Sequence, residues 1–296
     1  MKSHRTPCFS VIPLVAFLTI APLVSAAVIY ETGFSAADGY TVGALPTGTA
    51  GWTISLGGTS TINTFFIAGP GTQNPKIPSG LSAHPASLSD GNLFWIGART
   101  EGATSSNTNV ATLAFTDAEH RVQETFSVSF DLYVGPQSGS AGASFNFGLG
   151  QGTSVPAKAP LIRLHSAGSS GGTTSLRIRD DGTDLTGQAI LDQNAWYRFV
   201  LTVNPATGSS GTYGVAVYTL DAEGTITGTA FLTPETYDYS GVNGGFDSLR
   251  FSNVSNRSDY WIDNITISTI PEPRAATLLG GVIALLCMIV LKLRCR

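Results

Sequence analysis

The stretch that decides the fold is TFSVSFDLYVG, residues Thr125–Gly135. Its apolar and polar side chains alternate: Phe126, Val128, Phe130 and Leu132 share one face, and Ser127, Ser129, Asp131 and Tyr133 share the other. Because successive side chains of a strand point to opposite faces, a period of two indicates an antiparallel strand with one face on a core. We therefore expect this stretch to be one strand of an antiparallel sheet.

Similar segments recur along the chain and are separated by turn-forming residues. The clearest pair is Trp196–Val203 and Tyr213–Leu220, which a loop of Asn, Pro, Gly and Ser joins into a hairpin. About a dozen such strands with Gly-rich turns predict an all-β protein built as a two-sheet antiparallel β-sandwich. One helical turn is expected, near Thr116–Glu124.

The order of the segments adds a resemblance. An early VIYETGF (Val28–Phe34) is followed by FSVSFDLYVG, then by WYRFVLTVN (Trp196–Asn204), and last by YWIDNITIS (Tyr260–Ser268). This pattern resembles the concanavalin A-like, or laminin-G-like, jelly roll of many exported bacterial proteins. The resemblance implies a jelly-roll sandwich for the whole central part of the chain.

The N-terminus has the pattern of a secretory signal peptide. Lys2 and Arg5 give a positive start, and the apolar stretch 9–24 ends in small residues. A signal peptidase would cut between Ala26 and Ala27, which makes residues 1–26 a signal peptide. The segment that follows is therefore expected outside the cytoplasm.

The C-terminus has the pattern of a membrane anchor. Pro271-Glu272-Pro273 precedes an uncharged apolar run, residues 275–291, that would span about 25 Å as a helix. Three basic residues follow the run and are expected to stay on the cytoplasmic side as a stop-transfer tail. They are Lys292, Arg294 and Arg296.

This arrangement of triplet, apolar span and basic tail resembles the PEP-CTERM sorting segment of Gram-negative bacteria. In that family a membrane enzyme, exosortase, is thought to cut near the triplet and to discard the span. The resemblance implies three parts: the signal peptide 1–26, a β-sandwich ectodomain 27–270 and a sorting segment 271–296. It also implies signal peptidase and exosortase as partners, with an inner-membrane intermediate before the cell surface or extracellular matrix.

Composition excludes several function classes for residues 27–270. The three cysteines, Cys8, Cys287 and Cys295, all lie in the end segments, so neither disulfides nor thiol catalysis is expected in the ectodomain. Residues 27–270 contain ten basic and nineteen acidic residues, a net charge of −9. An acidic domain of this kind argues against binding to nucleic acid and to anionic lipid.

No catalytic motif stands out in the ectodomain. The Glu-x-Asp-x-x-Glu run of jelly-roll glucanases is absent, although a carboxylate pair from separate strands stays open. The cluster Asp180, Asp181 and Asp184 is a calcium candidate, because hard cations prefer several carboxylate oxygens. An Asp-Gly hairpin turn explains the same residues without a metal, so no cofactor is expected.

Exposed tyrosines would offer a sugar-binding surface. Tyr237, Asp238 and Tyr239 lie among turn-forming residues, where we expect a surface loop. The sequence therefore favours a non-enzymatic cell-surface or matrix protein with a carbohydrate-binding or adhesive role. A polysaccharide-degrading hydrolase or lyase, and a purely structural coat protein, remain the alternatives.

Overall fold

The computed structural model describes residues 26–44, 46–55, 65–69, 92–96, 109–137, 143–166, 173–205, 209–221, 223–233, 236–254 and 258–270. Residues 26–270 form one compact unit with its own hydrophobic core. The proposed signal peptide, Pro271-Glu272-Pro273, the span 275–291 and the basic tail lie outside the described residues, except for Ala26. In the part of the chain that is described, no helix is long and apolar enough to cross a membrane.

Two antiparallel sheets make up the unit. Within the described residues, sheet A has nine strands: β1 (Val28–Thr32), β3 (Phe65–Ala68), β4 (Leu93–Ile96), β6 (Phe126–Gln137), β11 (Ala195–Pro205), β12 (Gly211–Leu220), β13 (Ile226–Leu232), β14 (Tyr237–Tyr239) and β16 (Ser258–Thr269). Sheet B has seven: β2 (Trp52–Ser55), β5 (Asn109–Ala114), β7 (Ala143–Gly150), β8 (Leu161–Ser166), β9 (Thr173–Asp180), β10 (Thr183–Asp192) and β15 (Ser248–Val254).

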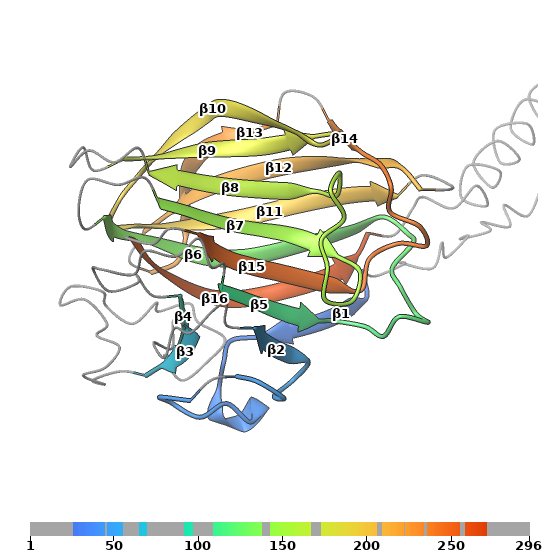
Figure 1. Cartoon of the computed structure of the whole chain (residues 1–296). Coiled ribbons are helices and arrows are strands. Elements are labelled where there is room, and N and C mark those ends of the chain that lie inside the picture. The colour runs from blue at the N-terminus through green and yellow to red at the C-terminus, as the bar shows by residue number, and fades with distance from the viewer. Residues whose placement is uncertain are drawn as a thin grey trace, which may run out of the picture. The chain divides into compact units, whose positions relative to one another are not determined.

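The strand order shows that distant parts of the sequence are neighbours in space. Sheet A runs β13-β12-β11-β6-β16-β4-β3, with β1 paired to β16 and β14 paired to β12. Sheet B runs β10-β9-β8-β7-β15-β5-β2. Figure 1 shows β9, β8, β7 and β15 of sheet B in front of β12, β11, β6 and β16 of sheet A. The predicted all-β, two-sheet antiparallel sandwich is confirmed.

Aromatic side chains fill the space between the two sheets. Phe130 of β6 is fully buried and stacks on Phe199 of β11, with ring centroids 5.5 Å apart. From sheet B, Phe147 and Phe251 meet the same ring edge-on, at 4.8 and 5.6 Å. The alternation that marks β6 in the sequence therefore places Phe130 at a contact between the sheets.

The helical turn expected near Thr116–Glu124 is not a helix, so this prediction was wrong. The chain forms turns there, and the Asp117 carboxylate accepts hydrogen bonds from the backbone N–H groups of Glu119 and His120. An Asp side chain that bonds to nearby backbone N–H groups stabilises a turn as readily as a helix start. In the described residues the one helical element is a short 3₁₀ turn, η1 (Ala36–Asp38).

Candidate functional site

The outer face of sheet B carries arginines because its strands alternate strictly. On β8, Ile162 and Leu164 are buried in the core, so Arg163 and His165 between them point outward. On β9, Leu176 and Ile178 are buried in the same way, which turns Arg177 and Arg179 outward. Arg250 of β15 alternates with buried Leu249 and Phe251.

Strand pairing brings these side chains onto one surface. Arg177 lies opposite Arg163, Arg163 lies opposite Asn146, and Asn146 lies opposite Ser252. Because neighbouring strands are about 4.8 Å apart, the distance from β9 to β15 is about 14 Å. We call the surface formed by Arg163, Arg177, Arg179 and Arg250 the arginine face.

Two of these arginines share one carboxylate. The Asp184 side chain accepts from Arg163 Nη1 at 2.9 Å and from Arg179 Nε at 3.0 Å. Arg163 Nε also donates to Asn146 Oδ1 at 2.9 Å. Arg163 and Arg179 are therefore held in place by protein groups.

The other two arginines have open hydrogen-bonding capacity. The Nε atoms of Arg177 and Arg250 are buried and have no hydrogen-bond partner, and neither side chain has an ion pair within the described residues. Burial lowers the pKa of Arg250 below its ordinary value, yet a guanidinium stays charged at neutral pH. A planar guanidinium matches a carboxylate or a sulfate with two parallel hydrogen bonds. The arginine face thus carries two half-buried guanidinium groups without an ion pair in the described residues, on a domain that is otherwise acidic.

His165 lies beside the arginines on the same surface. Its Nδ1 is 3.0 Å from Ser144 Oγ of the neighbouring strand. Burial, followed by the charges of Arg177 and Arg163, lowers the pKa of His165 below its usual 6.5. The imidazole is therefore mostly neutral at pH 7 and can act as a proton acceptor there.

The outer face of sheet A carries a carboxylate pair from separate strands, Asp131 and Asp263. They are cross-strand partners on β6 and β16, and both are fully buried. Arg198 holds Asp131 through two hydrogen bonds, Nε to Oδ1 at 2.7 Å and Nη2 to Oδ2 at 2.9 Å. A glycosidase needs carboxylates that a sugar can reach, so this buried pair does not form such a groove.

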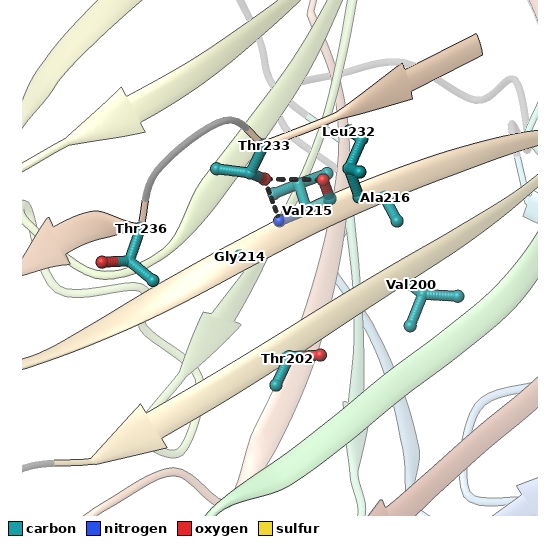
Figure 2. Close-up of a pocket in the computed structure, with 8 residues that line it drawn as sticks. All are labelled: Val200, Thr202, Gly214, Val215, Ala216, Leu232, Thr233 and Thr236. Carbon is teal, nitrogen blue, oxygen red and sulfur yellow. Dashed lines mark hydrogen bonds between the residues drawn. The ribbon is translucent and has the colours of Figure 1, made fainter. Parts of the chain in front are cut away.

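A shallow pocket of about 280 Å³ lies elsewhere on sheet A, over β11 and β12 (Figure 2). Thr233 forms one wall of the pocket. Two hydrogen bonds hold it against β12: its hydroxyl accepts from the N–H of Val215 at 2.5 Å and donates to the C=O of Val215 at 2.6 Å. Among the described residues, the lining of the pocket carries no charged or titratable side chain: Val200, Thr202, Gly214, Val215, Ala216, Leu232, Thr233 and Thr236.

The prediction that Tyr237 and Tyr239 are exposed on a surface loop was wrong. Tyr237 and Tyr239 are 7% and 2% exposed, whereas Asp238 between them is exposed. These residues form β14, which pairs with β12, and the alternation turns both rings inward. The Tyr237 hydroxyl donates to Gln188 Oε1 at 3.1 Å. The rings are therefore not available to stack on a sugar.

The calcium candidates are engaged in protein contacts. Asp180 accepts from the N–H of Asp238, Asp181 pairs with Lys158 at 2.9 Å, and Asp184 binds the two arginines described above. Asp181 and Gly182 have φ of 39° and 90°, the left-handed conformation of a tight hairpin turn. No group of three or more metal-ligating side chains occurs in the ranges that the structure describes.

Sequence reasoning missed the arginine face. The signal was present as LIRLHS (Leu161–Ser166) and SLRIRD (Ser175–Asp180), two strands with arginine on the outward positions. Their pairing to each other and to β7 and β15 depends on contacts between segments far apart in the chain.

Comparison with known proteins identifies no family. No family model matches the chain, and no curated protein matches it. Among solved structures, the CBM2 module of the Dit protein of Lactobacillus casei BL23 phage J-1 is 13% identical, with a TM-score of 0.46, covering 84% of this chain and 98% of its own. The marine PL-14 alginate lyase of Aplysia kurodai is 13% identical, with a TM-score of 0.39, covering 62% and 85%. The endo-β-1,4-glucuronan lyase of Trichoderma reesei is 9% identical, with a TM-score of 0.40, covering 82% and 96%. The fold assignment above therefore rests on the strand order and pairing of the chain itself.

Proposed function

We propose that residues 27–270 bind an acidic polysaccharide through the arginine face, at the surface or in the extracellular matrix of a Gram-negative bacterium. The observation that carries this proposal is the pair of buried, unpartnered Nε donors on Arg177 and Arg250. A carboxylate or sulfate group would supply the hydrogen-bond acceptors that these guanidinium groups lack within the described residues.

The spacing of the arginines supports an extended ligand rather than a single small anion. Arg177 and Arg250 lie on strands about 14 Å apart; Asn146 lies on β7 between those strands, and Ser252 lies two residues from Arg250 on β15. The amide and hydroxyl groups of these two residues suit sugar hydroxyls, whereas the arginines suit the acidic groups of the polymer.

The charge of the whole domain disfavours nucleic acid as the ligand. Nucleic-acid binders usually carry a dense basic patch and a high isoelectric point, whereas this chain has a pI near 5.5 and a net charge of −4. The negative net charge of the domain opposes the approach of any polyanion, so binding of an acidic polymer depends on close contact at the arginine face.

A binding assay with a polymer panel tests this proposal. The domain 26–270 is titrated with a polyuronate, a sulfated polysaccharide, a neutral glucan and single-stranded DNA. We expect binding to the polyuronate or the sulfated polymer, weakened by added salt because the contacts are ionic. Binding to the neutral glucan alone, or to DNA alone, would contradict the proposal. Binding to none of the four would favour the structural coat protein.

Delivery to that location is part of the same proposal. Signal peptidase would release the chain after Ala26, and the span 275–291 would hold it in the inner membrane until exosortase acts near Pro271-Glu272-Pro273. The support is the sequence pattern of the two ends.

Replacing Pro271-Glu272-Pro273 with three alanines is expected to leave the protein in the inner membrane. The physical reason is that the span stays attached when the cutting enzyme no longer recognises its site. Cell fractionation followed by immunoblotting measures the outcome, with the unchanged chain fractionated in parallel. A variant that reaches the cell surface in normal amounts would rule out sorting through this triplet.

A further inference from the structure

His165 adds a proton acceptor to the arginine face, and this combination suits one reaction of uronic acid polymers. The sugar ring of a uronate carries its carboxylate next to a carbon that bears a hydrogen and lies beside the glycosidic linkage. Loss of that hydrogen as a proton is difficult, because negative charge develops next to a carboxylate that is already negative. Cationic donors on the carboxylate lower this barrier by stabilising the developing charge.

The proton acceptor and the cationic donors for the carboxylate lie on neighbouring positions of the sheet. His165 and Arg163 lie two residues apart on the outer face of β8, and Arg177 of β9 lies opposite Arg163. The cross-strand neighbours of His165 are serines, Ser144 on β7 and Ser175 on β9. The imidazole is thus close to two guanidinium groups, and the residues directly opposite it carry no charge.

The tautomer of His165 decides which of its two ring nitrogens is reactive. Nδ1 lies 3.0 Å from the Ser144 hydroxyl, and in the tautomer in which Nδ1–H donates to that oxygen, Nε2 carries the free lone pair. Nε2 has no hydrogen-bond partner in the described residues, and His165 is only partly buried. A ligand bound to the arginines can therefore reach this nitrogen.

We propose that the arginine face, besides binding a polyuronate, cleaves it by β-elimination with His165 Nε2 as the base. This inference rests on the proposed function, because the arginines must first hold the uronate carboxylate. Nε2 takes the proton from C5, the electron pair forms the C4–C5 double bond, and the bond from C4 to the glycosidic oxygen breaks. The departing oxygen takes a proton from water, and the histidinium returns its proton to the resulting hydroxide. No oxidant, metal or cofactor enters this balance.

Protonation of the His165 imidazole should give kcat/KM a characteristic dependence on pH. Only the neutral imidazole accepts the proton, so kcat/KM should rise with pH through the pKa of His165 and then level off. Burial and the charges of Arg177 and Arg163 hold that pKa below 6.5, so the free protein should be fully competent at neutral pH. The groups that face His165 from β8, β7 and β9 are Arg163, Ser144, Ser175 and Arg177, of which only the arginines carry charge.

The test incubates the domain 26–270 with polygalacturonate, polyglucuronate and alginate, and follows the ultraviolet absorbance of the new double bond. Mass spectrometry of the products must show unsaturated oligosaccharides. We expect His165→Gln to bind the intact polyuronate that the wild-type domain cleaves, with an affinity within about threefold of the wild type. Its kcat should fall at least about 100-fold, the usual contribution of a general base. Thr202→Val, in the pocket on the other sheet, is the matched control and should change neither quantity.

The outcomes separate the two proposals. Binding by the wild-type domain without any unsaturated product would overturn the elimination and leave the binding function intact. Absence of binding to every polyuronate would overturn the elimination. Absence of binding to the sulfated polysaccharide as well would also overturn the binding function. Product formation that is unchanged in His165→Gln would remove His165 as the base, and retained binding in that variant shows that it is folded.

Discussion

Replacing Arg198 with alanine is expected to destabilise the domain by about 3 kcal/mol or more. The reason is the environment of its partner: Asp131 is fully buried, and Arg198 supplies it with two hydrogen bonds of 2.7 and 2.9 Å. Asn264 Nδ2 also donates to Asp131 Oδ2 at 2.8 Å, but a neutral amide does not balance the charge of the carboxylate. Removing one member of a buried ion pair usually costs about 3–5 kcal/mol. Urea denaturation of the domain 26–270 measures the change.

Lys158→Gln is the matched control for Arg198→Ala. It also removes one positive charge from an ion pair, with Asp181 at 2.9 Å, but both side chains of that pair are about half exposed. Exposed pairs contribute little, so the midpoint of this variant should stay close to that of the wild type. Equal midpoints for Arg198→Ala and the wild type would show that Asp131 does not depend on Arg198.

Replacing Phe130 with alanine should have an effect of similar size, for a different reason. Phe130 is fully buried between the sheets and contacts Phe199, Phe147 and Phe251. Truncating a buried phenylalanine removes its hydrophobic transfer energy and leaves a cavity, which together cost about 3–5 kcal/mol. We expect the free energy of unfolding, measured by the same urea titration, to fall by this amount.

An exposed apolar residue provides the comparison for Phe130→Ala. Ile190 on β10 is 62% exposed, so Ile190→Ala loses few contacts and should change the free energy of unfolding by less than about 0.5 kcal/mol. If Phe130→Ala were no more destabilising than Ile190→Ala, the sandwich core described here would be incorrect.

The sandwich could be predicted because the patterns that indicate its strands and turns lie within short segments of the sequence. The alternation of Phe126, Val128, Phe130 and Leu132 fixes which face of β6 is buried, and β6 indeed turns these four residues inward. The Asp181-Gly182 turn is local as well, since an Asp-Gly pair between two alternating strands favours a tight hairpin.

The site could not be predicted in the same way, because it depends on which strands pair. Turn-forming neighbours made Tyr237 and Tyr239 look exposed, but pairing of β14 with β12 buries both rings. Arg250 joins Arg163 and Arg177 on one surface because β15 pairs with β7 and β7 pairs with β8. Such long-range pairing leaves no local trace in the sequence.

The central claim is that the arginine face binds an acidic polymer through Arg177 and Arg250. The most direct measurement is calorimetric titration of the domain 26–270 and of its Arg177→Gln/Arg250→Gln double variant with the polyuronate or sulfated polymer that the panel selects. Each hydrogen-bonded contact to a charged group contributes about 1.5 kcal/mol or more, so loss of both should weaken binding about 100-fold. Lys158→Gln, which also removes a positive charge, should bind within about threefold of the wild type. A double variant that binds as tightly as the wild type would contradict the account.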